Sequence, residues 1–116
     1  MKDLIASLIR RYCQKGVLID TNILLLFLVG SVNQERITRF NRTQQFIPED
    51  YELLLAFIAR FQKLVTTPNI LTEVNSLANQ LGEQERSQCF AIFAQFVKNV
   101  ALLDEYYASI GIIFDF

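Results

Sequence analysis

Short apolar runs and longer amphipathic stretches divide the chain into two kinds of element. Residues 17–20 begin as a continuous apolar run and stop abruptly at Asp20, which is the pattern of a short buried strand. Apolar and β-branched residues at 64–68 predict a second short strand ending at a turn, where Thr67 is suited to cap the next helix and Pro68 to begin it.

Helical periodicity accounts for most of the remaining chain. Apolar residues at helical spacing predict four amphipathic helices, over residues 3–14, 49–63, 68–81 and 83–98. Residues 22–29 are apolar on every side, so we expect a fully buried helix there, which Thr21 or Asn22 can cap. Asp20, which follows the strand, is the alternative N-cap of this helix. Three glycines are each expected to end the preceding helix, namely Gly16, Gly30 and Gly82.

The order of these elements places two acidic residues at one edge of a sheet. A strand, two helices and a second strand make a β-α-β unit, whose strands pair in parallel. Asp20 ends the first strand, and Glu73 lies in the second turn of the helix after the second strand. Because helical side chains lean toward the helix N-terminus, both carboxylates are expected to point to the carboxyl edge of the sheet. Two carboxylates in one pocket repel each other unless a cation lies between them, and oxygen ligands favour Mg²⁺ or Mn²⁺.

The composition supports one globular domain over residues 1–116 and excludes several kinds of chemistry. The chain has 116 residues, of which 52% are hydrophobic, and this suffices for a core. It contains no His, which excludes an imidazole base for a serine or cysteine nucleophile and the usual His-containing zinc sites. Cys13 and Cys89 fit no metal or redox spacing. Chemistry would therefore rest on carboxylates, a lysine or a bound metal ion.

The net charge of −1 hides an uneven distribution. Residues 1–46 carry seven Lys/Arg and three Asp/Glu, a charge of +4, while residues 47–116 carry four and nine, a charge of −5. Residues 31–49 are polar and are predicted to be irregular. Three arginines recur there at three-residue spacing, namely Arg36, Arg39 and Arg42. They form either a path for an RNA backbone or a solvated surface.

Two motifs resemble those of the PIN-domain nucleases. Leu-Ile-Asp-Thr-Asn-Ile, around Asp20, is similar to the first motif of that family, and Thr-Thr-Pro-Asn-Ile-Leu-Thr-Glu-Val, around Glu73, is similar to the second. The resemblance covers roughly residues 15–110. It implies a three-layer α/β/α fold with a short parallel sheet, shortened here at its C-terminus.

The shortening concerns the later acidic residues of the family, which have no matching pattern in this chain. Asp104, Glu105 and Asp115 are the only late acids, and Asp115 would substitute only if the tail folds back over the sheet.

The resemblance also implies an activity and its residues. Members of the family are metal-dependent ribonucleases, often toxins or RNA-processing enzymes, so we expect cleavage of single-stranded RNA with Mg²⁺ or Mn²⁺. By position, Asp20 and Glu73 are the implied metal ligands and catalytic residues, and Asn22 is implied to support the site by hydrogen bonding. RNA and an antitoxin-like protein are the implied partners.

A catalytically inactive PIN-derived module for binding or oligomerisation is the alternative function. A shortened sheet exposes strand edges, and the apolar tail at 112–114 favours self-association into a homo-oligomer. An α/β fold with another ligand is a third possibility, for which there is no motif. The first residues are amphipathic, and the strongest apolar segment, 17–29, is shorter than the ~20 residues of a membrane span, so we expect a cytoplasmic protein.

Overall fold

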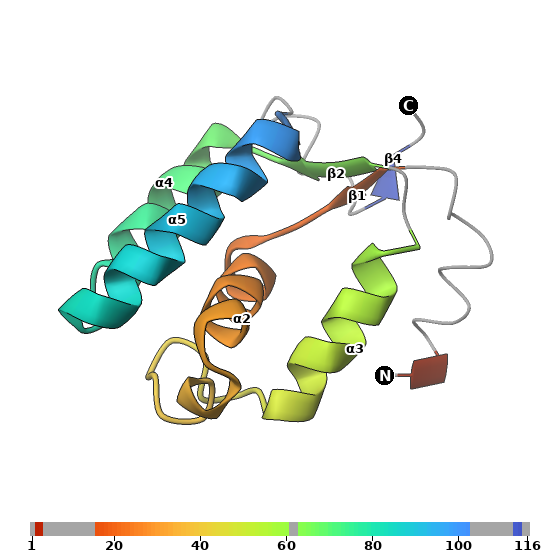
Figure 1. Cartoon of the computed structure of the whole chain (residues 1–116). Coiled ribbons are helices and arrows are strands. Elements are labelled where there is room, and N and C mark those ends of the chain that lie inside the picture. The colour runs from red at the N-terminus through yellow and green to blue at the C-terminus, as the bar shows by residue number, and fades with distance from the viewer. Residues whose placement is uncertain (1, 4–15, 61–62, 103–112, 115–116) are drawn as a thin grey trace.

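The described helices lie beside a small sheet (Figure 1). The structure is a computed structural model that describes residues 2–3, 16–60, 63–102 and 113–114. The elements are, in chain order, β1 (Gly16–Leu18), α2 (Thr21–Val32), the 3₁₀ turn η1 (Gln34–Arg36), α3 (Pro48–Ile58), β2 (Lys63–Thr66), α4 (Pro68–Ala78), α5 (Glu83–Asn99), β3 (Ala101–Leu102) and β4 (Ile113–Phe114). The described part is therefore a mixed α/β fold that is mostly helical.

The sheet has the strand order β3-β2-β1-β4. Strands β1 and β2 are parallel, with Val17 opposite Leu64, which confirms the predicted parallel pair and its helical crossover. Strand β3 pairs in parallel with β2, and β4 pairs antiparallel with β1. Ile113–Phe114, part of the tail that we expected to favour self-association, thus pairs within the chain along one side of β1.

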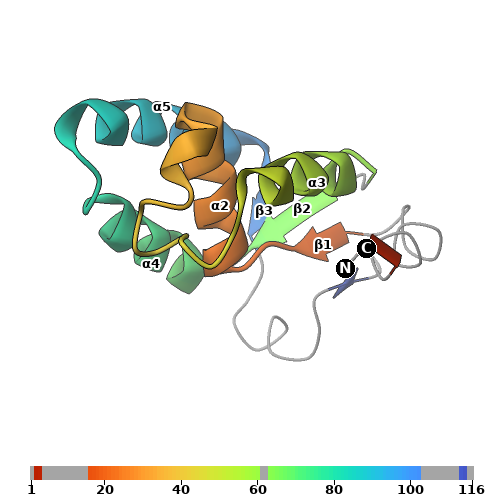
Figure 2. The same ribbon diagram turned by 90° about the horizontal axis from the view of Figure 1, so that it is seen from below.

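Helix α2 is the centre of the core, as its sequence predicts. Its residues Leu24, Leu25 and Leu28 are 0% exposed. They belong to one apolar cluster that includes Val17 of β1, Ile19 just after this strand, and residues of α3, α4 and α5. Figure 2 shows α2 and α3 on the same side of strands β1 and β2. In the part of the chain that the structure describes, the helices are too short or too polar to cross a membrane.

The other face of the sheet is also covered at β2. Strand alternation sends Leu64 and Val65 to opposite faces. Leu64 packs against the main apolar cluster, and Val65 is 1% exposed. Burial on both faces is typical of parallel strands. The helix predicted over 3–14 lies almost entirely outside the described residues, so the second helical layer of the α/β/α arrangement stays a prediction.

Gly30 does not end the buried helix, and the prediction that it does so is wrong. Helix α2 continues past Gly30 to Val32. The ring of Tyr51, from α3, lies where a side chain at position 30 would stand, because an added Cβ would be 2.6 Å from Cγ of Tyr51. Gly30 therefore allows α2 to approach α3 closely, because it has no side chain.

Other helix ends also differ from the predictions. Helix α3 ends at Ile58, before the predicted 63, and α4 ends at Ala78, before the predicted 81. Gly82 occupies the N-cap position of α5 instead of directly closing α4. Helix α5 covers the predicted range of 83–98 almost residue for residue. The predicted end of a helix is least accurate where its last turn is followed by an irregular turn with the same apolar spacing.

Candidate functional site

Asp20 lies directly after β1, at the edge where the parallel strands end. The preceding residue, Ile19, still pairs with β2, since its N–H donates to the carbonyl of Val65 at 2.9 Å. The Asp20 carboxylate accepts a hydrogen bond at Oδ1 from the N–H of Ile23 at 3.0 Å, which makes Asp20 the N-cap of α2. The residue is nevertheless exposed. It is thus held by a strand on one side and a helix on the other, while Oδ2 makes no hydrogen bond or ion pair with the described residues.

Asp20 is the cap of α2, which was the alternative to Thr21 or Asn22. Asp20 keeps the extended backbone of a cap (φ −85°, ψ 177°), and its carbonyl accepts the first helical bond from the N–H of Leu24 at 2.9 Å. Thr21 is then already the first helical residue. Capping occupies one side of one carboxylate oxygen, and an ionised carboxylate offers about four lone-pair sites. The cap and a metal-ligand role are therefore compatible.

Asn22 lies beside Asp20 on the first turn of α2 and is exposed. Its amide makes no side-chain hydrogen bond within the described part of the chain. The support by hydrogen bonding that the family resemblance implies for Asn22 thus stays a prediction.

Glu73 lies on α4, which begins immediately after β2. Thr67 caps this helix, as predicted, with its Oγ1 accepting from the N–H of Ile70 at 3.2 Å. Glu73 is exposed, whereas the next residue, Val74, is 0% exposed and belongs to the core cluster. Five residues separate Glu73 from the start of the helix at Pro68, a rise of about 8 Å. Glu73 therefore lies beside the buried stripe of α4, at the middle of the 11-residue helix.

The structure brings some of the predicted site residues together and leaves others outside its description. Asp20 and Asn22 share the start of α2, and Glu73 stands on α4, which packs against α2 and starts at the adjacent strand end. Within the described ranges there is no group of three or more His, Cys, Asp or Glu side chains that could hold a metal ion. The late acids Asp104, Glu105 and Asp115 lie outside the described residues. Strand β4 ends beside Gly16, at the opposite end of β1 from Asp20.

The donor set of this edge fits a hard divalent cation and fits zinc or copper poorly. Asp20 and Glu73 contribute carboxylate oxygens, and Asn22 contributes an amide oxygen. Mg²⁺ is commonly held by one or two carboxylates while it keeps several waters, so exposed oxygen donors suit it. The hydroxyl groups of Thr66 and Thr67, at the end of β2, are 0% exposed and already engaged in hydrogen bonds.

Thr66 is a site-supporting residue that the sequence reasoning missed. Its Oγ1 donates to the carbonyl of Ile19 at 3.4 Å, across 47 residues of chain. The bond ties the end of β2 to the residue that precedes Asp20. A hydroxyl residue at the buried end of an apolar strand was the available signal, since a buried polar group needs a partner.

No protein-family model matches this chain, and neither the curated proteins nor the solved structures gave a match. The resemblance to PIN-domain nucleases therefore rests on its two motifs.

Proposed function

We propose that this protein is a Mg²⁺- or Mn²⁺-dependent endoribonuclease of the PIN type that cleaves single-stranded RNA. The observation that carries the proposal is the position of Asp20, an exposed carboxylate fixed between a buried strand and the helix that it caps. Open α/β sheets bind ligands at this carboxyl edge. Packing does not require an acid there, because Asn or Ser caps a helix equally well.

Asp20 and Glu73 are the residues that would hold the metal ion. When bound, the ion would lower the pKa of a water molecule and offset charge on the phosphodiester. The bond from Ile23 to Oδ1 fixes the Asp20 carboxylate, so that Oδ2 is presented without a search over rotamers. Asn22 offers an amide N–H₂ group beside this carboxylate for a phosphate oxygen or a water molecule.

The test is a cleavage assay that separates charge from capping. Asp20→Asn keeps an N-cap residue and removes the negative charge, and Glu73→Gln does the same on α4. The matched control is Glu52→Gln, which removes an exposed carboxylate from α3. With labelled single-stranded RNA and millimolar Mn²⁺, we expect each site variant to lose about 100-fold or more in rate, since a metal ligand is worth several kcal/mol.

Folding and contamination are controlled in the same experiment. The site variants should keep the wild-type circular dichroism spectrum and the wild-type unfolding midpoint in EDTA. Equal cleavage rates in wild type, Asp20→Asn and Glu73→Gln would show that the activity comes from elsewhere and would contradict the proposal.

An inactive interaction module is the second candidate, and one observation favours it. Among the residues that the structure describes, three large apolar side chains are exposed, Ile47 by 52%, Leu55 by 37% and Val97 by 42%. In that case no RNA is cleaved and the chain associates with itself or with a protein partner, which sedimentation equilibrium detects. Asp20→Asn would then leave stability unchanged or raise it, because any repulsion between carboxylates falls.

A further inference from the structure

The segment between α2 and α3 is a series of turns with a three-residue repeat. Backbone N–H groups donate to carbonyls three residues earlier at five places along it, from Arg36, Ile37, Arg39, Thr43 and Phe46. Such a repeat brings residues three apart to the same side. Ile37, Phe40 and Thr43 are 0%, 3% and 0% exposed, so one side of the segment belongs to the core. The predicted irregular region is thus irregular but packed.

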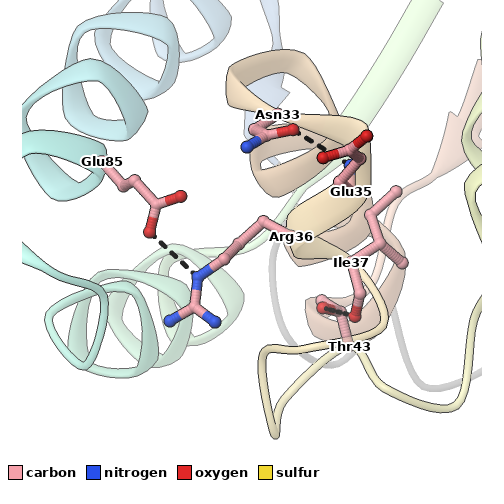
Figure 3. A network of polar contacts seen from close by, with 6 residues as sticks. All are labelled: Asn33, Glu35, Arg36, Ile37, Thr43 and Glu85. Atoms are coloured by element: carbon pink, nitrogen blue, oxygen red, sulfur yellow. Dashed lines mark hydrogen bonds and ion pairs between the residues drawn. The ribbon is translucent and has the colours of Figure 1, made fainter.

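Arg36 fastens this segment to α5. Its Nε donates to Oε1 of Glu85 at 2.9 Å, and its guanidinium lies 5.6 Å from the ring centroid of Phe40. Figure 3 shows Arg36 pointing away from Ile37 and toward Glu85. The charge of Arg36 is therefore paired. Arg36 is thus the one of the three regularly spaced arginines that has a structural role.

Arg39 and Arg42 remain on the exposed side of the segment. Residues 36–47 contain no Asp or Glu, and the acid nearest to Arg39 in sequence is Glu35, four residues before it. The Arg39 side chain makes no hydrogen bond or ion pair with any described residue. Nε of Arg42 donates to Oε1 of Gln80 at 3.1 Å, which orients the guanidinium and leaves both Nη groups without a described partner.

A third arginine reaches the same place from α5. Nη1 of Arg86 lies 3.5 Å from the carbonyl oxygen of Asn79, next to the residue that holds Arg42. Glu85, beside it, is occupied by Arg36, so Glu83 and Glu35 are the exposed acids on the adjoining elements. The exposed neighbours within the segment are neutral hydrogen-bonding side chains, those of Thr38, Asn41, Gln44 and Gln45.

We propose that Arg39, Arg42 and Arg86 form a contact surface for the phosphate backbone of single-stranded RNA. Arginine with neighbouring amide and hydroxyl side chains is the usual set for phosphate and sugar contacts. RNA is named as the polyanion on the basis of the proposed nuclease function. The surface lies at the far end of α2 from the strands (Figure 1), about 18 Å from Asp20 by the rise of this 12-residue helix. It would therefore hold the RNA several nucleotides from the carboxyl edge.

Binding is measured in EDTA, so that no metal-dependent cleavage intervenes. Fluorescence anisotropy of a labelled single-stranded RNA gives the Kd of the full chain over a range of salt concentrations. For Arg39→Gln with Arg42→Gln, we expect the slope of log K against log salt to become shallower by about 1.4, which corresponds to roughly 25-fold weaker binding at 0.1 M salt. Glu83→Gln should tighten RNA binding, because it removes an exposed acid from the start of α5.

The matched control removes two positive charges elsewhere. Arg60, beyond the opposite end of α3, and Lys98, near the end of α5, are both exposed. Arg60→Gln with Lys98→Gln should keep the wild-type Kd and salt slope. Equal losses of RNA affinity in the two double variants, or no loss in either, would overturn the proposed contact surface. Displacement of the RNA by poly-glutamate as readily as by unlabelled RNA would assign it to acidic proteins and also overturn the proposal.

The proposal of the binding surface and the proposal of the nuclease function can be refuted independently of each other. Asp20→Asn should bind RNA as wild type does in EDTA, because the metal is absent in both. Cleavage that depends on Asp20, together with unchanged binding by the Arg39 and Arg42 variant, would overturn the surface and leave the function. Weakened binding by that variant, together with no Asp20-dependent cleavage, would support the surface and overturn the function.

Discussion

At the scale of single residues, the contact between Gly30 and Tyr51 leaves no room for a methyl group. Gly30→Ala should gain about 1 kcal/mol of helix propensity. The new Cβ would overlap the Tyr51 ring and shift it away from Ser31, whose Oγ lies 3.0 Å from the Tyr51 hydroxyl. Overpacking costs typically 1–3 kcal/mol, so we expect a net loss of about 1 kcal/mol in the free energy of unfolding, measured with urea.

A double-mutant cycle identifies the cause of that loss. In a Tyr51→Ala background the ring is gone, and Gly30→Ala should become neutral or stabilising by up to about 1 kcal/mol. The same loss in both backgrounds would mean that Gly30 is needed for a reason other than the packing of α2 against α3.

Cys89 makes the free energy of unfolding of this protein fall at alkaline pH. The thiol is 0% exposed at α5, and burial raises its pKa from an ordinary value of 9.0 to about 11. The neutral thiol is thus favoured in the folded state, so its contribution to stability is complete below pH 9 and is lost as the pH rises toward 11. Between pH 7 and pH 10 the loss is about 1.4 kcal/mol.

Urea unfolding of wild type and Cys89→Ala at pH 7 and pH 10, with a reductant present, measures this contribution. Other groups titrate in both proteins, so the informative quantity is the difference between their losses. Cys89→Ala should lose less stability over this range than wild type. Equal losses would show that the thiol ionises as readily when folded as when unfolded.

At the scale of elements, the Arg36–Glu85 pair connects η1 to the first turn of α5. The two side chains are 26% and 29% exposed, and both remain partly hydrated. Arg36→Met, Glu85→Gln and the double variant should give a coupling energy of about 0.5–1 kcal/mol by urea unfolding, lower at high salt because water and ions screen the pair. A coupling near zero would leave only the packing of Arg36 on Phe40.

Elements that rest on local patterns could be predicted from the sequence, and contacts between distant residues could not. The apolar run before Asp20 predicted β1, the all-apolar segment after it predicted the buried α2, and Thr67-Pro68 predicted the start of α4. The role of Gly30 depends on Tyr51, which lies 21 residues away and whose packing no local pattern reveals. The Arg36–Glu85 pair, separated by 49 residues, is hidden for the same reason.

At the scale of the whole molecule, half of the candidate site follows from the sequence. An acid at the end of an apolar strand places Asp20 at the carboxyl edge without further information. The position of Glu73 relative to that edge depends on which strands are neighbours. The β-α-β rule correctly predicted that β1 and β2 are neighbours. The bond from Thr66 to Ile19 required the register of β1 against β2, which no pattern along the chain specifies.

Binding of a divalent cation should stabilise the whole chain, because a ligand that binds only the folded state raises its free energy of unfolding. At a Mn²⁺ concentration of about ten times Kd the gain is about 1.4 kcal/mol, which corresponds to an unfolding midpoint higher by roughly 5 °C. Differential scanning calorimetry with and without Mn²⁺ measures the shift. Asp20→Asn should abolish it while keeping the cap of α2, and Glu52→Gln should retain it. An equal rise in the Asp20 variant would place the ion elsewhere, and the oxygen donors at the end of β1 would then serve the helix alone.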